Sequence, residues 1–111
     1  MKVSMLAVLT DIDGESIKAA GLKPGETTDL TLRMAIRAGV NAQVNPEDPS
    51  KAIPMAAVLR RCSIMNETKK DEAEFESDDV TLIKSTLPYT TLPIYAMGQV
   101  VNLLEGKSDG A

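Results

Sequence analysis

The N-terminal part of the chain places apolar and polar residues in a pattern that is typical of short strands. Residues 2–9, KVSMLAVL, are rich in Val and Leu, and Asp13-Gly14 then forms a dipeptide that favours a tight reversal of the chain. Residues 15–18 follow as a candidate returning strand. The pattern therefore predicts an N-terminal β-hairpin with its turn at Asp13-Gly14.

Helical spacing of apolar residues begins after the turn at Pro24-Gly25. A first helix is predicted to start near Asp29 and to end between Gly39 and Ala42. Its core-facing residues are Leu32, Ala35, Ile36 and Val40. Pro46 and Pro49 then require a loop, because two prolines so close together do not continue a helix.

A second helix is predicted from about Ser50, with Pro54 in its first turn, where a missing N–H costs least. Its apolar stripe consists of Met55, Val58, Leu59, Cys62 and Met65. This stripe places Cys62 in the core as a small buried residue, and the reactivity of its thiol is left open. The neighbouring pair Arg60-Arg61 is expected on a solvated face of the helix.

Two further helices follow a highly charged segment, residues 66–74, which is predicted to be an exposed connection. Ser77 as N-cap predicts the start of the third helix, which ends at Pro88. Pro93 is predicted as the first residue of the fourth helix, which Glu105-Gly106 closes. The expected core residues are Val80, Ile83 and Leu87 on the third helix, and Ile94, Met97, Gly98, Val101 and Leu104 on the fourth.

Together these elements predict a small α+β domain, mostly α, in which an N-terminal β-hairpin precedes about four packed helices. The length of 111 residues suits one domain, which we expect to span residues 1–106. Residues 107–111 are predicted to be a frayed C-terminal tail. With three aromatic residues and six methionines, the core is expected to be aliphatic.

Composition removes several classes of chemistry. The chain has no histidine and one cysteine, which excludes His-based acid–base catalysis, Ser-His and Cys-His nucleophiles and nearly every zinc site, so we expect no cofactor and no metal. The net charge of −4 provides no basic surface for nucleic acid. No apolar run is long enough for a membrane span or a signal peptide, so we expect no membrane association and a cytoplasmic protein.

The motif Asp11-x-Asp13-Gly14 after an apolar run is the candidate for catalysis. Phosphotransferases of the haloacid dehalogenase type present their nucleophile in this way, but they need a parallel sheet and further Mg²⁺-binding acids. Asp78-Asp79 supplies such acids only at a helix start, where the helix dipole already accounts for them. A calcium loop also fails at the required glycine and glutamate positions. The turn interpretation is favoured, and a Mg²⁺-dependent phosphotransferase using Asp11 and Asp13 remains the remote alternative.

Tyr89 and Tyr95 are the candidate partner-binding residues. They flank the second Leu-Pro of the doubled Thr-Leu-Pro sequence, between the third and fourth helices. Tyrosine is enriched in protein interfaces. Packing of both rings in the core or at a hairpin corner is the alternative, and the residues favour it.

The order of these features resembles a class of small proteins encoded by tailed phages and prophages. The resemblance rests on "MLAVLTDIDGESI", on the helical "DLTLRMAI" and on the terminal "VTLIKSTLPYTTLPIYAMGQVVNLLE". The chain differs in its second helix, where "KAIPMAAVLRRCSIM" replaces the Glu- and Lys-rich helix of that class. The resemblance implies a phage setting and an accessory or assembly role, and it supplies no catalytic residues.

From the resemblance and the residues together we expect a non-enzymatic accessory protein that acts by binding another protein, host or viral. Inhibition or modulation of a host or defence protein in the host cytoplasm is the favoured function. The alternative is a part in virion assembly, as a tail chaperone or capsid-associated protein. Homo-oligomerisation is left open.

Overall fold

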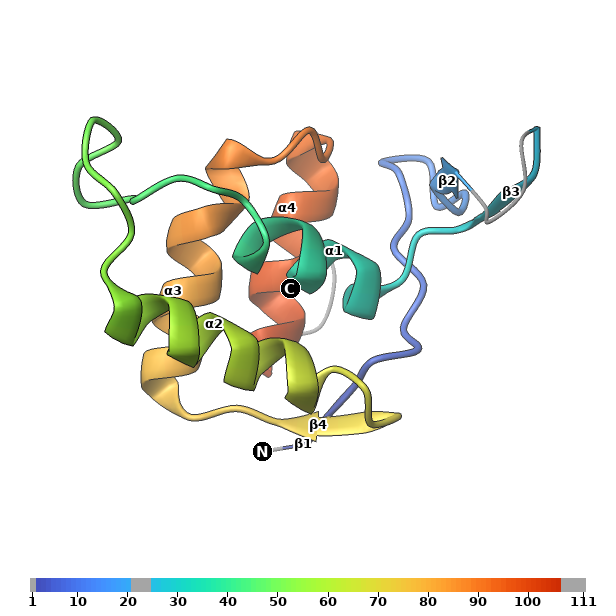
Figure 1. The fold of residues 1–111 in the computed structure, drawn as a ribbon. Helices are drawn as coiled ribbons and strands as arrows, with labels where there is room; N and C mark the ends of the chain where they lie inside the picture. Colours follow the sequence, from blue (N-terminus) through green and yellow to red (C-terminus); the bar gives the residue numbers. More distant parts are fainter. Residues whose placement is uncertain (1, 21–24, 107–111) are drawn as a thin grey trace.

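The computed structural model describes residues 2–20 and 25–106, and over these the chain forms four α-helices and two antiparallel two-stranded sheets (Figure 1). The elements in chain order are β1 (Lys2–Ser4), β2 (Lys18–Ala20), β3 (Thr27–Asp29), α1 (Leu32–Val40), α2 (Met55–Glu67), β4 (Glu72–Glu74), α3 (Ser77–Thr86), the 3₁₀ helix η1 (Leu87–Tyr89) and α4 (Ile94–Leu104). This confirms the predicted α+β class, with an N-terminal hairpin and four helices. The predicted tail, residues 107–111, lies outside the described residues.

The chain reverses at Asp13-Gly14, as the sequence predicts. Gly14 adopts a φ of 84°, a left-handed conformation that glycine tolerates without steric cost. Thr10 and Ser16 form an antiparallel bridge on either side of the turn. The predicted return strand over residues 15–18 is wrong in its extent, because β2 starts only at Lys18 and pairs with β3.

Strand β1 pairs with β4, which lies far away in the sequence. Val3 stands opposite Ala73 in this register, and both side chains are buried. The prediction that residues 66–74 form an exposed connection is therefore correct for most side chains of the segment but wrong for Thr68 and Ala73, which are buried, and for residues 72–74, which form a strand. Glu72 and Glu74 point outward on either side of Ala73, which is the alternation expected of a strand with one buried face.

Arg33 on α1 fastens the same segment to the helices. Its Nε donates to the carbonyl oxygen of Thr68 at 2.7 Å, and its Nη2 donates to that of Lys70 at 3.0 Å. Thr68 is fully buried at the end of α2. The first bond satisfies the carbonyl group of Thr68, which the end of α2 leaves without a helical partner, and the second holds the segment that follows the helix.

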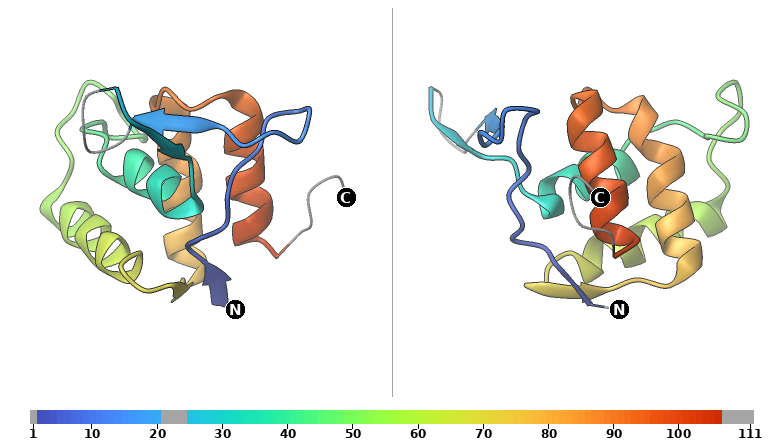
Figure 2. Two further views of the ribbon diagram at one scale, coloured as in Figure 1. Left: turned by 90° about the vertical axis from the view of Figure 1, so that its right-hand side faces the viewer. Right: turned by 180° about the vertical axis from the view of Figure 1, so that it is seen from behind.

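Helix α1 lies at the centre of the fold and contacts α2, α3 and α4. Its predicted stripe is confirmed, since the residues that it buries include Leu32, Ala35, Ile36 and Val40. Ile83 and Leu87, which the sequence assigns to the core face of the third helix, are also buried. In Figures 1 and 2, α3 and α4 lie side by side, and Lys84 on α3 donates to Glu105 beyond α4 at 2.6 Å.

Helix α2 is rotated relative to the prediction. Met55 and Leu59 are 68% and 64% exposed, and Cys62 is exposed rather than buried. Arg61, expected in solvent, is only 4% exposed, and Ile64 is buried beside it. The buried face has moved by about one residue, which corresponds to roughly 100° around a helix.

Helix α4 shows a similar departure. Ile94, which the spacing assigns to the core, is 85% exposed, and Gly98 is exposed as well. The residues that α4 buries are Ala96, Gln99, Val100 and Leu104. Of the predicted core residues of this helix, Leu104 is therefore buried, while Met97 and Val101 are partly buried against the core.

The helix starts also differ from the prediction. Helix α1 starts at Leu32 with Thr31 as its N-cap, and the residues where its start was expected, Thr27–Asp29, form β3. Helix α2 starts at Met55 with Pro54 as its N-cap, several residues later than expected. Glu76, not Ser77, caps α3, and it forms a reciprocal capping box with Asp79. Pro93 is the N-cap of α4 rather than its first residue. Within residues 2–20 and 25–106, no helix combines the length and apolar character needed to cross a membrane.

Candidate functional site: an exposed apolar corner

Tyr89 and Tyr95 lie at the two ends of the connection between α3 and α4. Tyr89 is 43% exposed as the last residue of η1, and Tyr95 is 44% exposed in the first turn of α4. Ile94 lies between them in sequence and is the most exposed large apolar residue of the described part of the chain. We call Tyr89, Ile94 and Tyr95 the α3–α4 corner.

Local hydrogen bonds shape the connection that carries the corner. The Thr90 backbone N–H donates to the Leu87 carbonyl at 3.0 Å, and the Thr90 hydroxyl donates to the same oxygen at 2.7 Å. The Leu92 N–H in turn donates to the Thr90 hydroxyl at 3.3 Å. Leu87 is buried, so these bonds link an exposed connection to a core residue.

Gln99 lies on the buried face of α4, together with Ala96, Val100 and Leu104. Its side chain is almost completely buried, and its Oε1 accepts the Thr10 backbone N–H at 3.0 Å. Its Nε2 donates to the Thr10 carbonyl oxygen. Ile94, Tyr95 and Gly98 are exposed. A Cβ at Gly98 would have no neighbour within 4 Å.

The outer face of α2, defined by Met55, Leu59 and Cys62, is a second exposed apolar surface. It exists because Arg61 points inward and donates to the carbonyl oxygens of Val40, Ala42 and Val44. These carbonyls lie at and just beyond the end of α1, where helix geometry leaves oxygens without partners and favours a cation. Burial lowers the pKa of the Arg61 guanidinium below its ordinary value, because desolvation disfavours the charged form.

Asp11, the candidate nucleophile, is used by its own turn. Its Oδ1 accepts the backbone N–H groups of Asp13 at 2.9 Å and of Glu15 at 3.1 Å. Such bonds are typical of aspartate in turns. Asp79, the other acid considered for this chemistry, caps α3 through the Glu76 N–H and lies 3.0 Å from the Arg60 Nε.

The acidic residues of the turn do not assemble a metal-ligand set. Across residues 2–20 and 25–106 there is no group of three or more His, Cys, Asp or Glu side chains placed to hold a metal ion. Asp13, the second acid of the motif, is exposed at the tip of the turn. In the structure, the motif Asp11-x-Asp13-Gly14 forms a turn of the backbone.

The sequence identified both tyrosines of the corner but missed Ile94. Its spacing matched the apolar stripe of α4, but the burial of Ala96, Gln99 and Val100 shows that the helix is turned away from that stripe. The signal available in the sequence was a polar glutamine between apolar neighbours, which does not reveal its distant partner, Thr10. In comparisons with protein-family models, curated proteins and solved structures, no match to this chain was found.

Proposed function

We propose that this chain is a non-enzymatic protein-binding module that contacts its partner through the α3–α4 corner. The observation that carries the proposal is the exposure of three large side chains, Tyr89, Ile94 and Tyr95, within seven consecutive positions. Exposed aromatic and aliphatic side chains that cluster are typical of binding surfaces, and tyrosine is among the residues that dominate binding energy.

The resemblance to small phage and prophage proteins supports a particular setting for this binding. The partner is then a host or viral protein, and the favoured role is inhibition or modulation of a host or defence protein in the host cytoplasm. The alternative role is virion assembly, as a tail chaperone or capsid-associated protein. The two roles differ in where the partner comes from, which an experiment can separate.

The test is affinity capture with matched variants from infected and uninfected bacterial lysates, followed by affinity measurements with the captured protein in purified form. Ile94→Ser and Tyr95→Ser remove apolar surface at the corner. Leu59→Ser removes similar apolar surface from the outer face of α2, so it controls for general stickiness.

The corner variants are expected to weaken binding by about tenfold or more each, as truncation of a central interface residue does, while Leu59→Ser stays within about twofold of the wild type. A partner captured from uninfected lysate supports a host target, and one found only after infection supports virion assembly. Equal losses in all three variants, or no loss in the corner variants, would contradict the proposal.

A further inference from the structure

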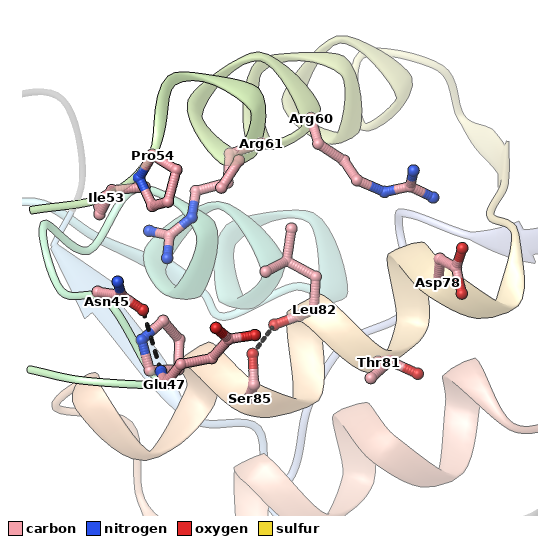
Figure 3. Close-up of a pocket in the computed structure, with 12 residues that line it drawn as sticks. Asn45, Glu47, Ile53, Pro54, Arg60, Arg61, Asp78, Thr81, Leu82 and Ser85 are labelled. Carbon is pink, nitrogen blue, oxygen red and sulfur yellow. Dashed lines mark hydrogen bonds between the residues drawn. The ribbon is translucent and has the colours of Figure 1, made fainter.

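A groove of about 510 Å³ lies between α2, α3 and the loop that precedes α2 (Figure 3). Its apolar lining consists of Pro46, Ile53, Pro54, Ala57 and Leu82. Both the volume and the largely apolar lining suit a small organic ligand. The groove is separate from the α3–α4 corner, because its lining includes none of the corner residues.

Arg61 reaches into this groove from α2, and Figure 3 shows its side chain extending toward the loop at Asn45. A guanidinium has five N–H donors. In Arg61, Nη1 donates to Val40 and Ala42, and Nη2 donates to Val44. The Nε–H and one Nη2–H remain, and Nε is buried without a hydrogen-bond partner among the described residues. Nε and Nη2 form an edge of the guanidinium that can donate two parallel hydrogen bonds to a carboxylate.

The charge of Arg61 has no acidic counterpart in the described part of the chain. Its hydrogen bonds go to backbone carbonyls, and no carboxylate forms an ion pair with it. The Nε of the adjacent Arg60 is likewise buried without a hydrogen bond among the described residues, but Arg60 differs in its charge balance, because its Nε lies 3.0 Å from Asp79 and its Nη2 lies 3.6 Å from Glu76. A buried cation without an acid is costly, and an anionic group from outside relieves that cost.

The other charges of the groove restrict which anion fits. Glu47 and Asp78 line it as well, and both are exposed acids. They oppose a ligand that carries several negative charges, such as a phosphate ester. One unbalanced guanidinium beside an apolar channel is instead complementary to a single negative charge on an apolar body.

We propose that this groove binds a small apolar monocarboxylic acid, with the carboxylate at the Nε and Nη2 edge of Arg61 and the apolar part against Ile53, Ala57 and Leu82. This proposal does not depend on the function proposed for the corner. It follows from the unused donors of a buried arginine that reaches into an apolar groove.

The test is an NMR titration of the isotope-labelled, full-length protein with octanoate, and with octanol as the uncharged counterpart. Octanoate is expected to shift the Arg61 Nε–H resonance and the backbone resonances of the groove in a saturable manner. Binding should be about tenfold tighter than that of octanol, because only the carboxylate forms a charge-assisted hydrogen bond. Equal binding of the two probes, or shifts confined to another part of the surface, would overturn the proposal.

Variants keep the test informative even though Arg61 also holds the end of α1. Ala57→Phe fills the groove while leaving Arg61 in place, and it should abolish saturable octanoate binding. Glu47→Gln removes a like charge from the groove and should tighten binding by about two- to fivefold. Arg60→Gln changes the adjacent arginine, which is already paired, and should leave the affinity within about twofold. Unchanged binding in Ala57→Phe, or a greater loss in Arg60→Gln than in Ala57→Phe, would count against the proposed site.

Discussion

Helices α1 and α2 pack against each other, yet α1 buries its predicted apolar stripe whereas α2 exposes much of its own. Helix α1 buries Leu32 and Ile36 completely. Helix α2 leaves Met55 and Leu59 in solvent and buries the charged Arg61 instead. The two helices thus differ in which side chain decides how each of them is oriented about its axis.

The difference shows that the hydrogen bonds of one buried polar side chain, Arg61, can stabilise a helix orientation more than the burial of an apolar stripe would. A hydrogen bond to a charged group contributes a net of about 1.5–3 kcal/mol, which is comparable to the burial of one leucine side chain. Arg61 makes three such bonds to carbonyls at and beyond the end of α1. Turning α2 to bury Met55 and Leu59 would break all three, so the observed orientation is favoured.

The largest expected effect compares the two apolar stripes directly. Ile36→Ala in α1 should destabilise the protein by about 2–5 kcal/mol, because it removes a fully buried side chain and leaves a cavity. Leu59→Ala in α2 should change stability by less than about 0.5 kcal/mol. Chemical denaturation of both variants measures the two values. A loss in Leu59→Ala that approaches that of Ile36→Ala would contradict the orientation of α2.

The next effect concerns the anchor itself. Arg61→Met keeps much of the side-chain length but leaves the carbonyl groups of Val40, Ala42 and Val44 without their donor, so a loss of about 2–4 kcal/mol is expected. Arg60→Gln is the matched control, since its partly exposed ion pairs with Glu76 and Asp79 are worth about 1 kcal/mol or less. Urea unfolding curves measure both. Similar losses for the two arginines would argue against Arg61 as the anchor.

Two helix glycines sharpen the comparison between packed and open faces. A Cβ at Gly39 on α1 would lie 2.8 Å from the Thr86 hydroxyl, which is itself bonded to the Ile83 carbonyl, so Gly39→Ala should destabilise by about 1–3 kcal/mol. A Cβ at Gly98 on α4 meets nothing, so Gly98→Ala should stabilise by about 0.5–1 kcal/mol. Thermal unfolding should shift in opposite directions. Shifts of the same sign would contradict the packing described for one of these helices.

The last comparison tests the buried side chain of Gln99 on α4. Gln99→Leu leaves the N–H and carbonyl of Thr10 without their side-chain partner, and a loss of about 1–2 kcal/mol is expected although the new side chain is apolar. Hydrogen exchange of the Thr10 amide should accelerate in the same variant. Unchanged stability together with unchanged exchange at Thr10 would contradict the hydrogen bonds described between Gln99 and Thr10.

The parts of the fold that follow from nearby residues could be predicted from the sequence. The turn at Gly14 and the buried stripe of α1 are examples, since both depend on spacing within a few positions. The orientations of α2 and α4 could not be predicted, because Arg61 and Gln99 find their partners at residues 40–44 and at Thr10.

The candidate site also contains residues that could be predicted from the sequence and others that could not. Both tyrosines of the corner could be named as candidates because aromatic residues are rare in this chain. Ile94 was missed because α4 buries the face that carries Ala96, Gln99 and Val100, and Ile94 lies on the opposite face. The groove at Arg61 was missed because a pair of adjacent arginines on a helix is typical of a solvated face.

The most direct test of the central claim, that Arg61 turns the apolar stripe of α2 outward, is the reactivity of Cys62. Cys62 is the one cysteine of the chain, so a chromogenic disulfide reagent reports on this position alone. Cys62 in the native protein should react within about tenfold of its rate in denaturant, because the thiol is exposed. Labelling that is slower by about a thousandfold or more, and that requires global unfolding, would mean that Cys62 is buried and would contradict the account.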